Sequence, residues 1–128
     1  MTAPFRVVVI EDDPDLRKLI QVTLQFTAGW EVATAADGPA GLTRVRDVRP
    51  DAVLVDLMMP DMDGYEVCRR LKADPATVAI PLILITARQQ LDEARLRASG
   101  AAGVIQKPFD PDQLAPRVRA LAADPPRG

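Results

Sequence analysis

Apolar residues recur along this chain in short runs separated by longer stretches of mixed character. The run Val7-Val8-Val9-Ile10 is almost wholly apolar, which is typical of a strand buried on both faces of a sheet. A later run, at residues 30–35, alternates between apolar and polar positions instead. The pattern predicts five strands, at residues 7–10, 30–35, 52–55, 80–85 and 104–106.

Between these runs the apolar residues return with helical spacing, which predicts five helices. Asp13-Pro14 is typical of a helix start, with an N-cap followed by proline in the first turn, and Gly29 ends that helix. The other predicted helices cover about residues 39–49, a short stretch through Cys68 and Leu71 that Asp74-Pro75 ends, residues 90–99, and the stretch after Asp110-Pro111.

Alternating strands and helices indicate an α/β fold, in which a parallel sheet is covered by helices on both faces. In such doubly wound sheets, ligands bind beyond the carboxyl ends of the strands. The polar residues that follow each strand are therefore the first candidates for function.

Composition limits what such a site can belong to. The chain has 128 residues, of which 27% are charged and 48% hydrophobic, as expected of one globular domain. A net charge of −2 gives no basic footprint for nucleic acid or an anionic membrane. The absence of histidine excludes imidazole catalysis, and the single cysteine, Cys68, is expected to be a core residue.

The two ends of the chain predict where the protein acts and how it is divided. Its start lacks the apolar core of a signal peptide, and no run is long enough to span a bilayer, so we expect a cytoplasmic protein. Residues 1–123 are expected to form the domain, and residues 124–128, rich in proline, a linker-like tail.

Polar residues with complementary chemistry follow four of the predicted strands: Glu11-Asp12-Asp13, Asp56, Thr86 and Lys107. An aspartate at a strand end is a competent nucleophile toward a phosphoryl donor. Crowded carboxylates need a hard cation such as Mg²⁺ to offset their repulsion. An ammonium and a hydroxyl can bind phosphoryl oxygens, so the set predicts a site for a divalent cation and a phosphoryl group.

Each of these residues also has a simpler structural interpretation. Acids after a strand are often helix caps or solvated turns, Thr86 is a good strand former, and Lys107 could be an exposed loop residue. Their joint occurrence at successive strand ends favours the site.

Four ordered segments carry a family resemblance: residues 7–13, residues 55–64 (Val-Asp-Leu-Met-Met-Pro-Asp-Met-Asp-Gly), Ile85-Thr86-Ala87, and Gln106-Lys107-Pro108-Phe109. Together they resemble the receiver domain of two-component response regulators, over essentially the whole chain. The resemblance implies a flavodoxin-like sheet with strand order 2-1-3-4-5. It also implies that the domain is no enzyme beyond its own phosphorylation and dephosphorylation.

The resemblance implies a role for each matching residue. Asp56 would accept the phosphoryl group from a sensor histidine kinase or a phosphotransfer protein. Thr86 and Lys107 would contact that group, the Lys107-Pro108 bond would be cis, and Gly64 would allow a tight turn above the site. The implied Mg²⁺ ligands are Asp12, Asp56 and the backbone carbonyl of Met58, with Glu11 acting through water, while Asp13 is preferred as a helix cap.

Two departures from the family pattern change the expected output. Val104 stands where receivers often carry an aromatic partner for the threonine, and Ala102-Gly103 replaces acids that help winged-helix regulators to dimerise. The absent acids weaken the case for dimerisation and favour a stand-alone receiver that docks to an unidentified protein partner, without nucleic acid or membrane contacts. The alternative is that the proline-rich tail marks where a longer protein was cut.

The principal hypothesis is a phosphorylation switch. The alternative is a receiver-fold interaction module that works without phosphate, which Val104 favours and the complete set of site residues disfavours. A phosphohydrolase or phosphomutase is disfavoured because Met58 stands where such enzymes carry a second acid.

Overall fold

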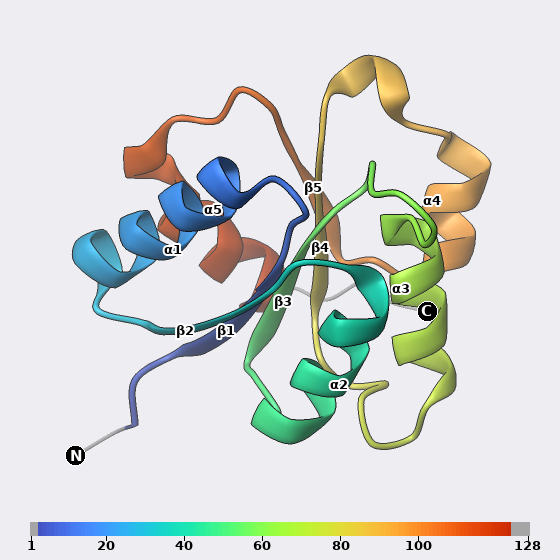
Figure 1. The fold of residues 1–128 in the computed structure, drawn as a ribbon, viewed down its shortest axis with the longest axis horizontal. Coiled ribbons are helices and arrows are strands. Elements are labelled where there is room, and N and C mark those ends of the chain that lie inside the picture. Colours follow the sequence, from blue (N-terminus) through green and yellow to red (C-terminus); the bar gives the residue numbers. More distant parts are fainter. Residues whose placement is uncertain (1–2, 124–128) are drawn as a thin grey trace.

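The computed structural model describes residues 3–123, and in this part of the chain five parallel strands form one sheet in the order β2-β1-β3-β4-β5 (Figure 1). This is the doubly wound, flavodoxin-like order expected from the family resemblance. The strands are β1 (Arg6–Ile10), β2 (Glu31–Ala35), β3 (Ala52–Asp56), β4 (Leu82–Thr86) and β5 (Gly103–Gln106).

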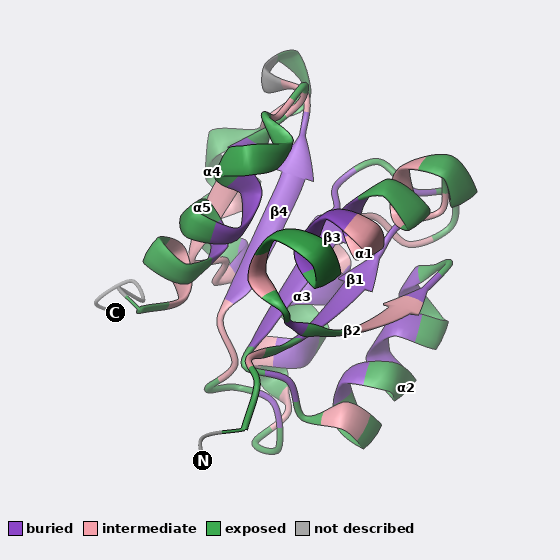
Figure 2. Ribbon diagram, turned by 90° about the vertical axis from the view of Figure 1, so that its left-hand side faces the viewer, coloured by how far each residue is buried: buried purple, intermediate pink, exposed green. Residues whose placement is uncertain are grey.

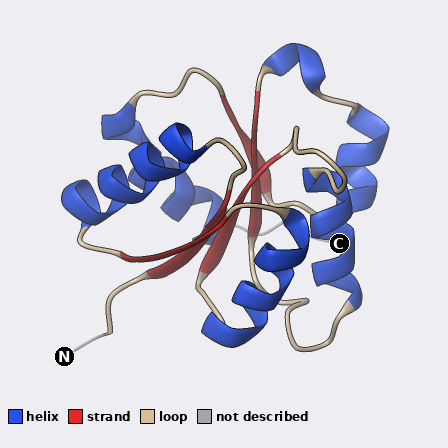
Figure 3. Ribbon diagram, viewed as in Figure 1, coloured by secondary structure: helices blue, strands red, loops and turns tan. Residues whose placement is uncertain are grey.

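Helices cover both faces of the sheet, as Figure 3 shows. The helical elements are α1 (Pro14–Ala28), α2 (Gly38–Val48), α3 (Gly64–Ala73), the short 3₁₀ turn η1 (Arg88–Gln90), α4 (Glu93–Ser99) and α5 (Pro111–Ala123). Helices α1 and α5 pack together on one face, and α2, α3 and α4 on the other.

Alternate strand residues build two separate cores, because successive side chains of a strand point to opposite faces. Val7 and Val9 pack with α1 and α5, whereas Val8 and Ile10 pack with α2 and α3. Both faces of the central strands are therefore buried, as Figure 2 shows, which explains why their sequences are continuously apolar. Cys68 is fully buried in the second core, as expected.

Local sequence signals at most element ends are confirmed. The Asp13 carboxylate accepts hydrogen bonds from the backbone N–H groups of Asp15 and Leu16 and so caps α1, and Gly29 ends α1 with a left-handed φ of 69°. The fourth helix was predicted wrongly to begin near residue 90. It begins at Glu93, because the Asp92 carboxylate caps it, and residues 88–90 form η1 instead.

No helix within residues 3–123 is long and apolar enough to cross a bilayer. The predicted tail at residues 124–128 lies outside the described residues.

Candidate cation and phosphoryl site

The register of the sheet brings the predicted site residues to one edge. Ile10 pairs with Val55, Asp56 with Ile85, and Thr86 with Gln106, so the chain leaves β1, β3, β4 and β5 at nearly the same level. The residues that follow these positions, Glu11 and Lys107 among them, therefore meet above the carboxyl edge of the sheet.

Three carboxylates form the acidic half of the site. Glu11, Asp12 and Asp56 each place one oxygen within 4.8 Å of the others. Glu11 and Asp56 are buried, at 1% and 4% exposed, while Asp12 is half-buried. Such an arrangement of oxygen ligands suits a hard divalent cation.

Glu11 has a buried carboxylate oxygen that is poorly compensated by its surroundings. Its Oε1 is buried and has no hydrogen-bond partner among the described residues, although its Oε2 accepts a bond of 3.1 Å from the Asp13 N–H. Burial, and to a lesser degree the neighbouring Asp56, raises the pKa of Glu11 to about 8. A cation or a proton at this position would satisfy the orphaned oxygen, so the residues present fit the Mg²⁺ that the family implies.

Lys107 provides the positive charge of the site. Its Nζ lies 3.3 Å from Asp56 Oδ2 and 3.8 Å from Glu11 Oε1. Its backbone N–H donates to the Thr86 carbonyl at 2.9 Å, and the Lys107-Pro108 peptide bond is cis, as expected. The ammonium is thus held against the nucleophile candidate by the end of β5.

Thr86 is fully buried at the end of β4, and its hydroxyl turns toward its own chain. It lies 3.2 Å from the Ala87 carbonyl oxygen and 3.2 Å from Gln90 Oε1. Among the described residues no hydrogen bond joins this hydroxyl to Asp56 or Lys107. The structure therefore brings Thr86 to the site edge with its hydroxyl engaged elsewhere.

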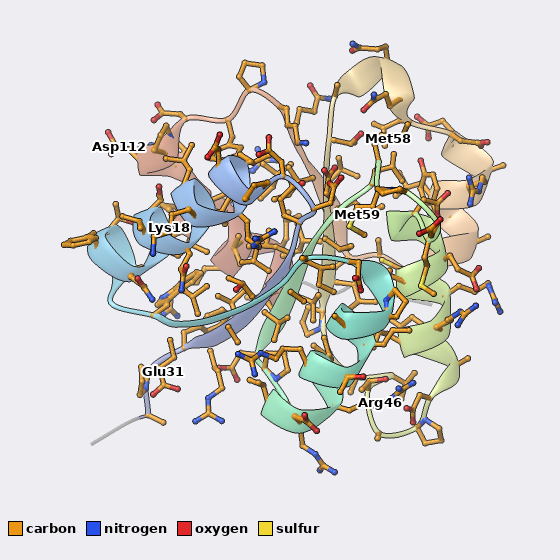
Figure 4. All side chains as sticks on the ribbon, viewed as in Figure 1. Lys18, Glu31, Arg46, Met58, Met59 and Asp112 are labelled. Atoms are coloured by element: carbon orange, nitrogen blue, oxygen red, sulfur yellow. The ribbon has the colours of Figure 1, made fainter. Side chains whose placement is uncertain are left out.

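The loop after β3 lies directly beside Asp56. The Met58 N–H donates to Asp56 Oδ1 at 3.2 Å, and the Met58 side chain, at 54% exposed, projects from the loop (Figure 4). The sharp turn of this loop falls at Asp61, whose φ is 71°, and not at Gly64. Gly64 is required for another reason, because a Cβ there would lie 2.8 Å from the Asp56 carbonyl oxygen.

Two polar contacts at the site were not predicted from the sequence. Arg17 reaches back from α1, and its Nη1 donates to the Glu11 carbonyl at 2.8 Å. Gln90 contacts Thr86 from η1. Arg17 lies one helical turn after Asp13, so the sequence could have indicated that its side chain reaches the loop before the helix. The sequence did not indicate the Gln90 contact, because Gln90 was expected inside a helix.

A hollow lies on the surface beside Val104. Val104 is half-buried on β5 and lines an open hollow of about 450 Å³ together with Phe109 and Arg117. The hollow lies between β5 and α5, and none of the three carboxylates lines it.

The fold and the site define a class: doubly wound α/β domains with an acidic cluster and a lysine at the carboxyl edge. The sequence matches the response regulator receiver domain family over residues 7–119, and the chain belongs to that family. The family resemblance noted in the sequence is thereby confirmed, and the chain is a regulatory domain of two-component systems.

Known relatives agree with this membership. The chain is 41% identical over 116 residues to the DNA-binding response regulator MtrA of Mycolicibacterium smegmatis, covering 90% of this chain and 49% of MtrA. It spans about half the length of the first curated relatives that it matches.

Solved structures agree with the fold. The chemotaxis response regulator CheY4 of Vibrio cholerae superposes with a TM-score of 0.85 at 29% identity, covering 93% of this chain and 99% of CheY4. The receiver domain of the sensor histidine kinase PA1611 from Pseudomonas aeruginosa PAO1 superposes with a TM-score of 0.84 at 27% identity, covering 94% of this chain and 99% of that domain. The PA1611 domain has a magnesium ion coordinated in its active site cleft.

Proposed function

We propose that this chain is a phosphorylation switch in which Asp56 accepts a phosphoryl group in a Mg²⁺-dependent reaction. The observation that carries the proposal is the pairing of the buried Asp56 carboxylate with Lys107 at 3.3 Å, beside a second buried carboxylate, Glu11, whose Oε1 has no partner among the described residues. The magnesium in the PA1611 receiver supports the choice of cation.

Each residue has a distinct part in the proposed transfer. An Asp56 carboxylate oxygen forms the new bond to phosphorus while the donor atom leaves with its electron pair. Asp12, Asp56 and the Met58 carbonyl would hold Mg²⁺, with Glu11 acting through water, and the ion would neutralise charge on the phosphoryl oxygens. Lys107 binds those oxygens as a point charge, which positions the product and does not supply the nucleophile.

The proposed donor is a sensor histidine kinase or a phosphotransfer protein, and the proposed output is a change in affinity for a protein partner. The phosphoryl group shifts a pre-existing equilibrium by as much as it prefers one conformation over the other. We propose that residues 1–123 form this unit.

Intact mass after incubation with Mg²⁺ and acetyl phosphate tests the proposal. A single phosphoryl adduct is expected on the wild type and on Asp13→Asn, since asparagine also caps a helix, but not on Asp56→Asn or after addition of EDTA. No wild-type adduct, together with no spectral response to beryllofluoride, would contradict the proposal and favour the phosphate-independent interaction module.

Lys107→Ala separates transfer from response. The variant is expected to retain the adduct while its amide NMR spectrum changes less on phosphorylation, because the ammonium binds the product oxygens. An undiminished spectral change in the phosphorylated variant would contradict the role proposed for Lys107.

A further inference from the structure

The Thr86 hydroxyl has a choice of partners in this structure. A hydroxyl donates one hydrogen bond at a time, and both available acceptors, the Ala87 carbonyl and Gln90 Oε1, lie at 3.2 Å. Hydroxyl hydrogen bonds are usually shorter than this, so both contacts are weak. The Thr86 hydroxyl is therefore only weakly held by its present hydrogen-bond partners.

The backbone of Thr86 is fixed more firmly than its side chain. Its carbonyl accepts the Lys107 N–H at 2.9 Å, and the residue pairs with Gln106 in the sheet. The hydroxyl can therefore reach a new partner by rotation about χ1, while the strand stays in place.

The far end of the β4–α4 connection is anchored on α3. The hydroxyl of the buried Tyr65 accepts the Asp92 N–H at 2.9 Å, which ties the start of α4 to the first turn of α3. Arg95 strengthens this anchor, since it pairs with Asp63 at 2.9 Å and its guanidinium carbon lies 4.6 Å from the centre of the Tyr65 ring. Residues 87–91, which include η1, thus span two fixed points and form the raised loop between β4 and α4 in Figure 1.

We propose that the Gln90 carboxamide is a positioning residue that holds the Thr86 hydroxyl in the resting state, and that a phosphoryl group on Asp56 competes with Gln90 for this hydroxyl. When Thr86 turns to the phosphoryl oxygens, Gln90 loses its contact and the turn at residues 87–91 is free to rearrange. The inference rests on the proposed function of Asp56.

The half-buried Val104 is consistent with this assignment. A valine has no ring that could follow a departing hydroxyl, whereas Gln90 touches the hydroxyl directly. Because the Gln90 contact is present in the resting state alone, it favours that state by its own net free energy. Because this contact is weak and the Ala87 carbonyl stays available to the hydroxyl, its loss is expected to shift the equilibrium about twofold toward the active arrangement.

Gln90→Met tests this inference, since methionine has nearly the same length and shape but is a poor acceptor. The matched control is Gln89→Met, an exposed neighbour in the same 3₁₀ turn. The χ1 populations of Thr86 are measured from three-bond couplings to its methyl carbon, with and without Mg²⁺ and beryllofluoride, and the acetyl phosphate adduct is measured by intact mass in parallel.

The expected result is that Gln90→Met, without beryllofluoride, raises the population of the Thr86 rotamer that beryllofluoride induces in the wild type, by about twofold. The amide shift changes should concentrate at residues 87–91, and Gln89→Met should match the wild type. Unchanged rotamers in Gln90→Met, or equal changes in both variants, would overturn the inference while a normal adduct leaves Asp56 phosphorylation intact. Absence of the wild-type adduct would instead overturn the proposed function, and this inference with it.

Discussion

The two ends of the sheet are held together by different kinds of contact. At the carboxyl end, three carboxylates lie together, the Lys107 ammonium pairs with two of them, and a buried oxygen of Glu11 has no hydrogen-bond partner among the described residues. At the amino end, the Phe5 and Trp30 rings lie 4.4 Å apart between centroids, with the Arg119 guanidinium over both. At the amino end, each of these groups packs against the others. At the carboxyl end, the clustered carboxylates lack enough positive charge among the described residues, which favours binding of a cation.

The difference indicates where this domain gains stability and where it gives stability up. Functional sites commonly break the packing and pairing rules that the rest of a fold obeys. Substitutions at the two ends should therefore act in opposite directions on the free energy of unfolding of the metal-free protein.

The largest effect is expected at the amino end. Trp30→Ala should lower the free energy of unfolding by about 3–5 kcal/mol, because it removes a buried aromatic side chain and leaves a cavity. Urea unfolding in the presence of EDTA measures this loss. The folded variant should still form the acetyl phosphate adduct, and a lost adduct would show that the two ends are not independent.

The second effect is a pH dependence at the carboxyl end. Glu11 has a pKa of about 8 in the folded protein against an ordinary value of 4.5, so the folded state binds more protons between these values. The free energy of unfolding of the metal-free protein should therefore fall as pH rises, by up to about 2 kcal/mol between about pH 6 and pH 8.

This pH window contains few other titrations. The chain has no histidine, and burial raises the pKa of the Cys68 thiol to about 12, so neither an imidazole nor this thiol titrates there. Urea unfolding at both pH values measures the fall, and saturating Mg²⁺ should abolish it by displacing the proton. An equal fall in Glu11→Gln would assign it to another group.

A smaller effect of opposite sign to Trp30→Ala is expected for Glu11→Gln. At about pH 8 the variant should raise the free energy of unfolding of the metal-free protein by about 1–2 kcal/mol, because it removes a poorly compensated buried charge. Mg²⁺ affinity, measured by calorimetry, should fall. Glu31→Gln is the matched control, since that exposed glutamate pairs with Arg6 at 3.0 Å at the amino end and should change stability little.

The smallest effect is expected for Arg119→Ala. Its guanidinium carbon lies 5.2 Å from the Phe5 ring and 5.8 Å from the Trp30 ring, and loss of this exposed contact should cost about 0.5–1 kcal/mol. Arg117→Ala, on the same helix, is the control, and thermal unfolding compares the two. Equal destabilisation by both variants would show that the aromatic rings contribute nothing specific.

The sequence predicted those parts of the fold that depend on local signals. The cap at Asp13 and the stop at Gly29 are properties of a few neighbouring residues, and they lie where the pattern indicated. The strands were predicted to within two residues of their observed bounds, and those at the centre of the sheet were the clearest because burial on both faces leaves little choice of residue type. The order of the sheet came from the family resemblance, since no local signal specifies which strands pair.

Other features could not be predicted, because they depend on contacts between distant segments. The anchoring of the start of α4 on Tyr65, 27 residues before Asp92, is such a contact, whereas the Asp92 cap itself was a local signal that the prediction missed. The role of Gly64 depends on the approach of Asp56, and the pKa of Glu11 depends on its burial. The clustering of the site residues was predictable from the topology of the sheet. The distances between these residues, and which of their polar atoms lack a hydrogen-bond partner, were not.

The contact made by Arg17 holds the loop of the proposed cation site in the folded protein. Its guanidinium donates to the Glu11 carbonyl and also lies 3.5 Å from the Asp12 carbonyl, so a side chain of α1 holds the loop after β1. The conformational entropy of these two residues is therefore lost during folding and not when an ion arrives. An incoming cation meets a loop that is already shaped, and its exchange with solvent should be limited by the shedding of its own water.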